Sequence, residues 1–258
     1  MRDVTEQTLH KVRRADVCAV AIADCFRGDG EILANPIGNL PVLGGRLARA
    51  VHEPQLMMTD GEAYLTGDVP PLGTAPEVIE GWNPFRRMFD VVWGGRRHVM
   101  MGASQIDRYG NQNIAAIGSD PDKPVRQLIG FRGAPGNTIN NTTSYWIPNH
   151  STRVFVEKVD LVCGIGYDRA AELGEVARFH NLRHVITNLA VLDFETPDHR
   201  MRLRSVHPGV TVEDVVANTG FELVIPDQVP TTRTPTDEEM AVIERLDPAG
   251  LRYREVKD

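Results

Sequence analysis

The feature that most constrains the fold of this chain is a series of short, continuous apolar runs separated by helix-like segments. The runs cover residues 17–22, 56–58, 98–101, 127–131, 161–165, 184–192 and 222–225. Helical patterns cover residues 40–52, 85–93, 169–179, 212–218 and 237–246. Runs without apolar–polar alternation indicate strands that are covered on both faces. The sequence therefore predicts the α/β class, with a mostly parallel sheet and helices on both of its faces.

The length and composition of the chain fit one large domain. Of its 258 residues, 41% are hydrophobic and 24% are charged, which is enough apolar material to bury a full core. Glycine and proline are spread along the whole length, so no segment has the composition of a linker. We expect residues 1–258 to form a single domain.

Two helices have recognisable starting signals. Thr211 is followed three residues later by Asp214, which is the spacing of a capping box. Thr236 precedes three acidic residues, and negative charge is favourable at a helix N-terminus. We interpret both signals as structural features with no part in function.

The charge and apolar patterns exclude several classes of partner. The formal net charge of −7 comes from intermixed signs with no basic block, so we expect no nucleic-acid binding. The first residues are too charged for a signal peptide, and no run approaches the ~18 apolar residues of a membrane span. We expect a cytoplasmic protein. Its three cysteines, Cys18, Cys25 and Cys163, are expected to fill the core as small apolar residues.

Two short motifs resemble ligand sites but fail on their details. Gly164 and Gly166 follow an apolar run, yet position 169 is Arg169, where a dinucleotide fingerprint has its third glycine. His180 and His184 have the spacing of a zinc pair on a helix, but no third ligand is evident nearby. We expect no metal site, no bound nucleotide cofactor, and two histidines at the surface or at a helix end.

Turns rich in glycine and amide side chains follow several of the predicted strands. They cover residues 38–45, 59–61, 102–113 and 130–137, with Asn140 and Asn141 beyond the last of them. In a parallel sheet, such turns gather at the carboxyl ends of the strands, where ligands bind. Glycine allows close approach of the backbone to a ligand, and free N–H groups there can hold an anion. The turns predict a binding cleft, although tight turns alone also explain the glycines.

Three of these stretches resemble the β subunits of class I CoA-transferases of the glutaconate type. They are residues 37–48, 102–113 and 207–214, and the element Gln-Ile-Asp-x-x-Gly-Asn-x-Asn at residues 105–113 is the most specific. The resemblance covers residues 17–221. It implies an α partner of similar fold in an α2β2 assembly and an active site at the interface. It also implies a CoA-thioester substrate, with coenzyme A present only as part of that substrate.

When the family's nucleophile motif is aligned with this chain, a different residue occupies the position of the nucleophile. The transferases carry a glutamate two residues before a glycine, and aligning that glycine with Gly61 puts Thr59 in the glutamate's place. Asp60 and Glu62 are offset from that position. We therefore assign no certain catalytic residue to this chain and expect a glutamate of the partner opposite Thr59. The candidate substrate-binding residues are Thr59, Asp60, Glu62, Gln105, Arg132, Gly133, Ala134, Gly136, Asn137, Asn140 and Asn141.

This chain keeps the glycine-rich turns of the family but lacks the nucleophile. In this it is similar to those family members that are hydrolases. The resemblance implies a β subunit that helps to open the last steroid ring of a CoA thioester in cholesterol breakdown, with the base on the α subunit. A CoA-transferase that uses Glu62 or a partner residue is the main alternative. A ligand-sensing domain is a third reading.

Overall fold

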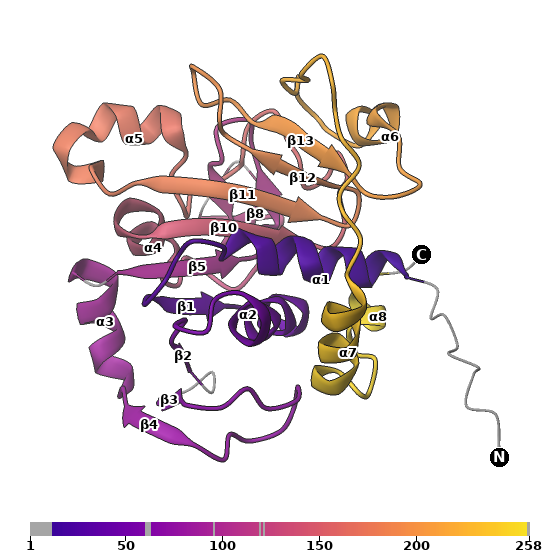
Figure 1. The fold of residues 1–258 in the computed structure, drawn as a ribbon. Helices are drawn as coiled ribbons and strands as arrows, with labels where there is room; N and C mark the ends of the chain where they lie inside the picture. Colours follow the sequence, from indigo (N-terminus) through magenta and orange to yellow (C-terminus); the bar gives the residue numbers. More distant parts are fainter. Residues whose placement is uncertain (1–11, 60–62, 95, 119, 121, 257–258) are drawn as a thin grey trace, which may run out of the picture.

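The computed structural model describes residues 12–59, 63–94, 96–118, 120 and 122–256. Its centre is a six-stranded sheet in the order β1-β5-β10-β11-β12-β13 (Figure 1). The strands are β1 (Leu33–Pro36), β5 (Arg97–Met101), β10 (Thr142–Ile147), β11 (Asn181–Thr187), β12 (Ala190–Asp193) and β13 (Arg202–Val206). The first four strands run parallel to one another, and β12 pairs antiparallel with both β11 and β13. The predicted mostly parallel sheet is confirmed.

The predicted helices are present, with ends shifted by a few residues. The helices are α1 (Arg14–Cys25), α2 (Asn39–Val51), α3 (Phe85–Gly94), α4 (Ala134–Asn140), α5 (Tyr167–Leu173), the 3-10 helix η1 (Gly174–Ala177), α6 (Val212–Ala217), α7 (Asp237–Leu246) and α8 (Arg252–Glu255). Both capping predictions are confirmed. The Thr211 hydroxyl accepts a hydrogen bond from the N–H of Asp214, and that of Thr236 accepts from Glu239.

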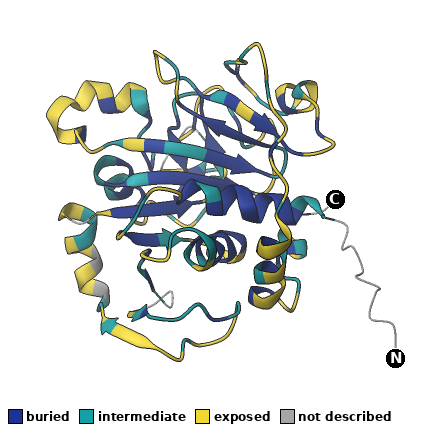
Figure 2. Cartoon of the chain, viewed as in Figure 1, coloured by how far each residue is buried: buried dark blue, intermediate teal, exposed yellow. Residues whose placement is uncertain are grey.

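Hydrophobic cores lie on both faces of the sheet. Met100 of β5 joins the core beneath α1, α2 and α7. Its neighbour Met101 joins the other core, which includes Ala134 of α4 and Val215 of α6. Because successive side chains of a strand point to opposite faces, one strand serves both cores. Figure 2 shows the middle strands as buried. The prediction of helices on both faces is confirmed.

The apolar run at residues 17–22 is a helix, so the prediction of a strand there was wrong. These residues form the middle of α1, which is buried on every side. A helix without a polar face shows no 3.6-residue periodicity, and such a run cannot be told from a buried strand by pattern alone. The expectation that the cysteines are core residues is confirmed, since Cys18, Cys25 and Cys163 are all buried and free.

Several other apolar runs contribute little to the central sheet. Of residues 127–131 only Gln127 lies in a strand, and residues 161–165 and 222–225 take part only in single bridges. The run at 184–192 covers parts of the antiparallel pair β11 and β12. Residues 127–131 are half-buried or exposed, and the runs at 161–165 and 222–225 lie in loops that are only partly buried, so an apolar run alone was not enough to predict a strand ladder. β10 and β13 were missed because polar residues interrupt them.

Smaller sheets flank the central one. Their strands are β2 (Met58–Thr59), β3 (Tyr64–Thr66), β4 (Ile79–Trp82), β6 (Gln105–Ile106), β7 (Gln112–Asn113), β8 (Ala116–Ile117) and β9 (Arg126–Gln127). The run at 56–58 enters β2, beside the edge strand β1. In the part of the chain that the structure describes, no helix has the length and apolar character required to span a membrane.

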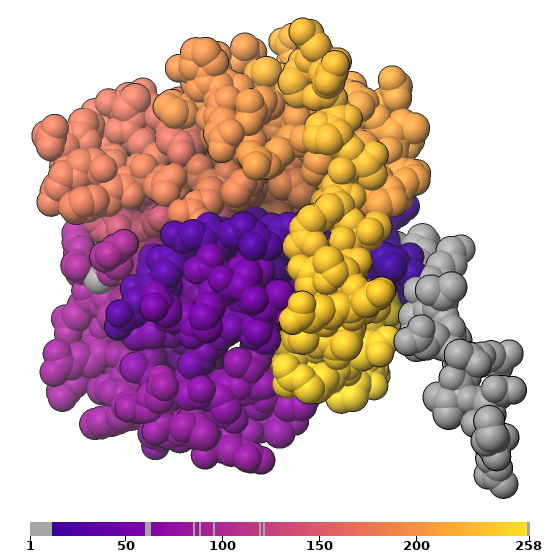
Figure 3. All heavy atoms as spheres, in the orientation of Figure 1, coloured from indigo at the N-terminus to yellow at the C-terminus, as the bar shows by residue number. Residues whose placement is uncertain are grey.

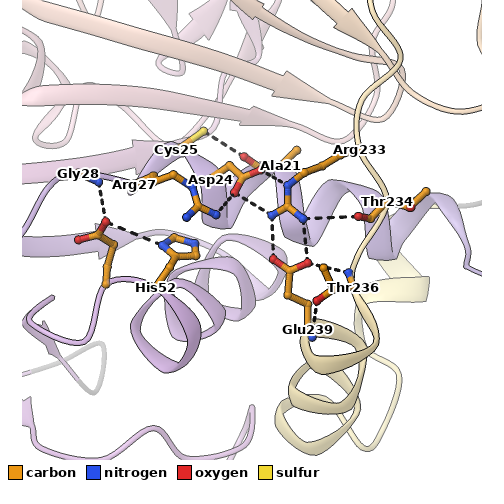
Figure 4. Close-up of polar contacts among 11 residues, drawn as sticks. Ala21, Asp24, Cys25, Arg27, Gly28, His52, Arg233, Thr234, Thr236 and Glu239 are labelled. Carbon is orange, nitrogen blue, oxygen red and sulfur yellow. Dashed lines mark hydrogen bonds and ion pairs between the residues drawn. The ribbon is translucent and has the colours of Figure 1, made fainter.

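The C-terminal segment crosses the boundary between two halves of the molecule. In Figure 3 its yellow spheres extend from the upper, orange half onto the lower, indigo and purple half. Arg233 of this segment donates hydrogen bonds to Asp24 of α1 and to Glu239 of α7 (Figure 4). One guanidinium thus ties the first helix, the connecting segment and a C-terminal helix together.

Candidate active site

A cleft lies at the carboxyl ends of the parallel strands β1 and β5. It has a volume of about 320 Å³ and is lined by Ile37, Met101, Gly102, Ile114, Ile129, Arg132, Gly133, Ala134 and Asn137. Ile37 directly follows β1, and Gly102 directly follows β5. The carboxyl edge of a parallel sheet is the usual place for a ligand. The fold therefore brings four of the predicted residues, 132, 133, 134 and 137, to one mostly apolar cleft.

The turn before α4 forms one wall of this cleft. Gly130 and Arg132 both have a left-handed backbone, with φ of 83° and 52°. Glycine adopts this conformation freely, whereas for arginine it costs about 1–2 kcal/mol. Strain of this kind in a residue other than glycine is typical of binding sites. The bend sets Arg132 at the cleft, immediately before Gly133 and Ala134.

Asn137 of α4 connects the cleft to a buried arginine. Its Oδ1 accepts a hydrogen bond from Nη2 of Arg97, and its Nδ2 lies 3.1 Å from Sδ of Met101. Arg97 is only 4% exposed, and its Nη1 donates to Oδ1 of Asn35 at 3.3 Å. Burial lowers the pKa of Arg97 to about 10, so the guanidinium stays charged at neutral pH. Arg97 lies next to an apolar run and in no motif, so no sequence pattern marks it as a site residue.

The cleft contains no carboxylate among the described residues that line it. Thr59 ends β2, which runs alongside β1 through a parallel bridge between Leu33 and Met57. Thr59 does not line the cleft. Asp60 and Glu62 lie outside the described residues. The described part of the cleft thus offers apolar surface, amide and N–H donors and the cation of Arg132, but no group that takes up a proton at neutral pH.

Asn140 and Asn141 lie at the opposite edge of the sheet from the cleft. They directly precede β10 and line a separate cavity together with Arg96, Arg97 and Arg183. The prediction that placed them with residues 130–137 was wrong because α4 carries the chain from the carboxyl edge back to the amino edge. Sequence proximity across a helix does not keep residues at one edge.

Two further predicted site residues have structural contacts away from the cleft. The Oε1 of Gln105 accepts hydrogen bonds from Nδ2 of Asn113 at 2.8 Å and from the backbone of Asp160 at 3.0 Å. A Cβ at Gly136 would lie 2.5 Å from Cγ1 of Val92, so this glycine allows α4 to pack against α3. Neither residue lines the cleft.

The turn at residues 107–111 is held by its own side chains. Oδ1 of Asp107 accepts from the backbone N–H groups of Tyr109 and Asn111, both at 3.0 Å. The Asn111 amide donates to Asp107 and to Asp168 at 2.9 Å, and its Oδ1 accepts from the N–H of Gly166 at 2.8 Å. The most family-specific element of the sequence thus fixes a turn.

The two rejected motifs have structural explanations. A Cβ at Gly166 would lie 2.5 Å from the carbonyl oxygen of Tyr109, so close packing explains this glycine. His184 lies within β11 and His180 precedes it, so the pair is not on a helix. Both are half-buried, and burial lowers the pKa of both, that of His184 to about 4. We expected both at the surface or at a helix end, and His184 lies instead within a strand. The described ranges contain no group of three or more His, Cys, Asp or Glu side chains arranged for a metal ion.

Large apolar side chains are exposed at one rim of the cleft and on α3 and β4. Ile129 lines the cleft while remaining 63% exposed. Other exposed side chains are Val125 and Phe131 near the rim, and Trp82, Phe89 and Trp93 on β4 and α3. We call Val125, Ile129 and Phe131 the apolar rim. Exposed apolar surface of this kind marks an interaction site in many proteins.

Comparison with known proteins places the chain in a family. The model of a family described as coenzyme A transferase matches residues 88–218. The IpdB subunit of the cholesterol ring-cleaving hydrolase from Rhodococcus jostii (strain RHA1) is 53% identical over 251 residues, which cover 97% of this chain and 98% of the relative. The chain belongs to the coenzyme A transferase family.

A solved structure and one further relative extend the comparison to the fold and to a second activity. The crystal structure of Rhodococcus jostii RHA1 IpdAB matches with a TM-score of 0.93 at 53% identity, over 96% of this chain and 100% of that chain. A subunit of the 3-oxoadipate CoA-transferase from Pseudomonas knackmussii is 31% identical, over 87% of this chain and 86% of the relative. The family therefore includes both hydrolase and transferase subunits on one scaffold.

Proposed function

We propose that this chain is the β subunit of a heteromeric hydrolase that opens the last steroid ring of a CoA thioester in cholesterol breakdown. The observation that carries the proposal is a cleft with no carboxylate among its described lining residues, in a chain 53% identical to an IpdB subunit. A covalent acyl carrier must lie at near-attack distance from the thioester carbonyl. Thr59 in the place of the family's glutamate removes that carrier, whereas hydrolysis of a carbon–carbon bond does not need it.

The groups that line the cleft indicate which parts of the reaction this chain supplies and which part the α subunit supplies. Ring opening beside a carbonyl requires a base and donors that stabilise the negative charge that develops on oxygen. A glutamate of the α subunit supplies the base. This chain supplies an apolar wall for the steroid ring, formed by Ile37, Ile114 and Ile129, and donors around Gly133 and Asn137. Arg132 is the cation at the cleft that can bind an anionic part of the substrate.

The α subunit binds over the apolar rim. Because Ile129 of the rim is also part of the cleft lining, a partner that covers this surface closes the cleft as well. Covering the rim brings a partner carboxylate to the substrate and excludes water from the side chains around it. We place the complex in the cytoplasm as an α2β2 assembly in which residues 1–258 act as one domain.

A CoA-transferase subunit is the second candidate, because a 3-oxoadipate CoA-transferase subunit is 31% identical to this chain. The two functions differ in their need for an acceptor acid. The chain is purified alone and with its α partner, and each preparation is given a ring-bearing CoA thioester with and without an acceptor acid. The proposal predicts turnover by the complex only, at a rate that the acceptor does not change. Turnover that requires the acceptor, or turnover by the isolated chain, contradicts it.

A further inference from the structure

Arg97 is a buried cation without a carboxylate partner within the described part of the chain. Its side chain contacts the amide oxygens of Asn35 and Asn137, and its Nε has no hydrogen-bond partner. Burying a charge without a counter-ion is unfavourable, and most buried arginines pair with Asp or Glu. The position of Arg97 at the start of β5, beneath the helix that borders the cleft, suggests what offsets this cost.

A guanidinium group determines the orientation of the amide beside it. Arginine has N–H donors and no acceptor, so the Asn137 atom that faces it must be the oxygen. The NH2 group of Asn137 is then directed to the other side, where it lies 3.1 Å from Sδ of Met101. Both Asn137 and Met101 line the cleft.

The NH2 group of Asn137 therefore has a fixed orientation but only a weak hydrogen-bond acceptor. Thioether sulfur is a weak acceptor, so an oxygen that carries negative charge competes with it easily. A buried positive charge on the other side of the amide polarises the group and strengthens its N–H donors, because hydrogen-bonded groups polarise one another at low dielectric. Such a donor, fixed before the reaction, is what stabilises a developing oxyanion.

We propose that Arg97 is a positioning residue that holds the Asn137 amide so that its NH2 group donates to the substrate oxygen that gains negative charge. The inference rests on the proposed function, since it assigns a role within the same cleft. Asn137 shares its hydrogen with the oxyanion and transfers no proton. Arg97 acts only through Asn137 and touches no substrate atom.

The α–β complex tests this inference through a double-mutant cycle with kcat, KM and melting temperature as readouts. Asn137→Ala should lower kcat about 100-fold, the typical effect of removing one oxyanion donor, with KM changed less than about 3-fold. Arg97→Met should lower kcat at least about 10-fold. Because Arg97 acts through Asn137, the double variant should be no slower than Asn137→Ala. Arg96→Met is the matched control, since Arg96 is exposed and adjacent in sequence, and it should leave kcat unchanged.

Asn137→Asp keeps the test valid if Arg97 variants do not fold. The new carboxylate gives Arg97 a counter-ion but removes the NH2 donor, so the melting temperature should rise while kcat falls about as far as in Asn137→Ala. A purely structural role for the pair predicts that Asn137→Asp retains kcat. Retained kcat, or multiplicative losses in the double variant, overturns the inference. The product formed by the wild-type complex is scored separately, so failure of the proposed function is distinguished from failure of the Arg97 role.

Discussion

Arg233 binds the carboxylate of Asp24 through two hydrogen bonds, Nε to Oδ2 at 2.7 Å and Nη2 to Oδ1 at 2.8 Å, across 209 positions of the chain. The same guanidinium binds both carboxylate oxygens of Glu239 at 2.8 Å. The Glu239 side chain is only 4% exposed, whereas that of Arg233 is 38% exposed. This contact joins the C-terminal segment to α1 and α7, which both pack over one face of the sheet.

Replacing Arg233 should destabilise the fold. In Arg233→Met, the buried Glu239 loses its counter-ion, and we expect the free energy of unfolding to fall by about 2 kcal/mol, below the full cost of breaking a buried pair because Arg233 is partly exposed. Arg27→Met is the control, because Arg27 also binds Asp24 but is 53% exposed, and it should change stability by at most about 0.5 kcal/mol. Urea unfolding measures both. Equal effects would contradict the role of Glu239 burial.

The turn held by Asn111 should matter for stability more than for chemistry. Asn111→Ala removes hydrogen bonds to Asp107, Asp168 and Gly166 and leaves buried groups without partners, so we expect a loss of about 2 kcal/mol. Asn149→Ala, at an exposed position, is the control and should have little effect. Thermal unfolding and activity are measured on the same samples. Complete loss of activity at an unchanged melting temperature would show instead that Asn111 takes part in the chemistry.

Buried histidines should make the fold sensitive to acid. Burial lowers the pKa of His150 to about 3 and that of His207 to about 4. The unfolded chain binds a proton at each near pH 6.5, so stability is complete above that pH and falls as the pH drops towards 4. We expect each histidine to cost about 2 kcal/mol between pH 6.5 and pH 5. In His150→Gln, the urea midpoint should fall less between pH 6.5 and pH 5 than in the wild type, because one of the two histidines no longer contributes. An unchanged dependence of the urea midpoint on pH would refute the lowered pKa of His150.

This chain should form no covalent acyl intermediate. We propose that Thr59 takes the place of the family's glutamate, so borohydride, which reduces an enzyme-bound thioester, should not inactivate the complex during turnover. Intact-mass measurement of the chain gives the same information, and Thr59→Glu is the matched variant that restores the family's residue. A mass increase of one CoA on the wild-type peptide that carries Asp60 and Glu62 would restore the transferase reading.

Much of the fold followed from the sequence because local signals and tertiary packing agreed. The capping residues Thr211 and Thr236 and the apolar run of β5 all indicated the elements that form. The strand predicted at residues 17–22 failed because α1 is apolar on all sides, which leaves no periodicity to detect. A continuous run of apolar residues indicates that a segment is buried. Burial alone does not distinguish a central helix from a central strand.

The site was only partly predictable for a geometric reason. Glycine-rich turns led to Arg132, Gly133, Ala134 and Asn137, which the structure places at one cleft, because a close bend after a strand has a local sequence signature. The contact of Arg97 with Asn137 spans 40 positions and depends on how α4 lies over β5. No short motif encodes such a pair, and it becomes visible only when the helix and the strand are placed together.

We propose that this chain serves hydrolysis of a carbon–carbon bond and not transfer of CoA. The most direct measurement is mass spectrometry of the products formed by the α–β complex in water enriched in oxygen-18, with a ring-bearing steroid CoA thioester and an added acceptor acid. We expect a ring-opened product that retains CoA and carries one labelled oxygen in its new carboxylate. An intact ring with CoA moved to the acceptor acid would contradict it.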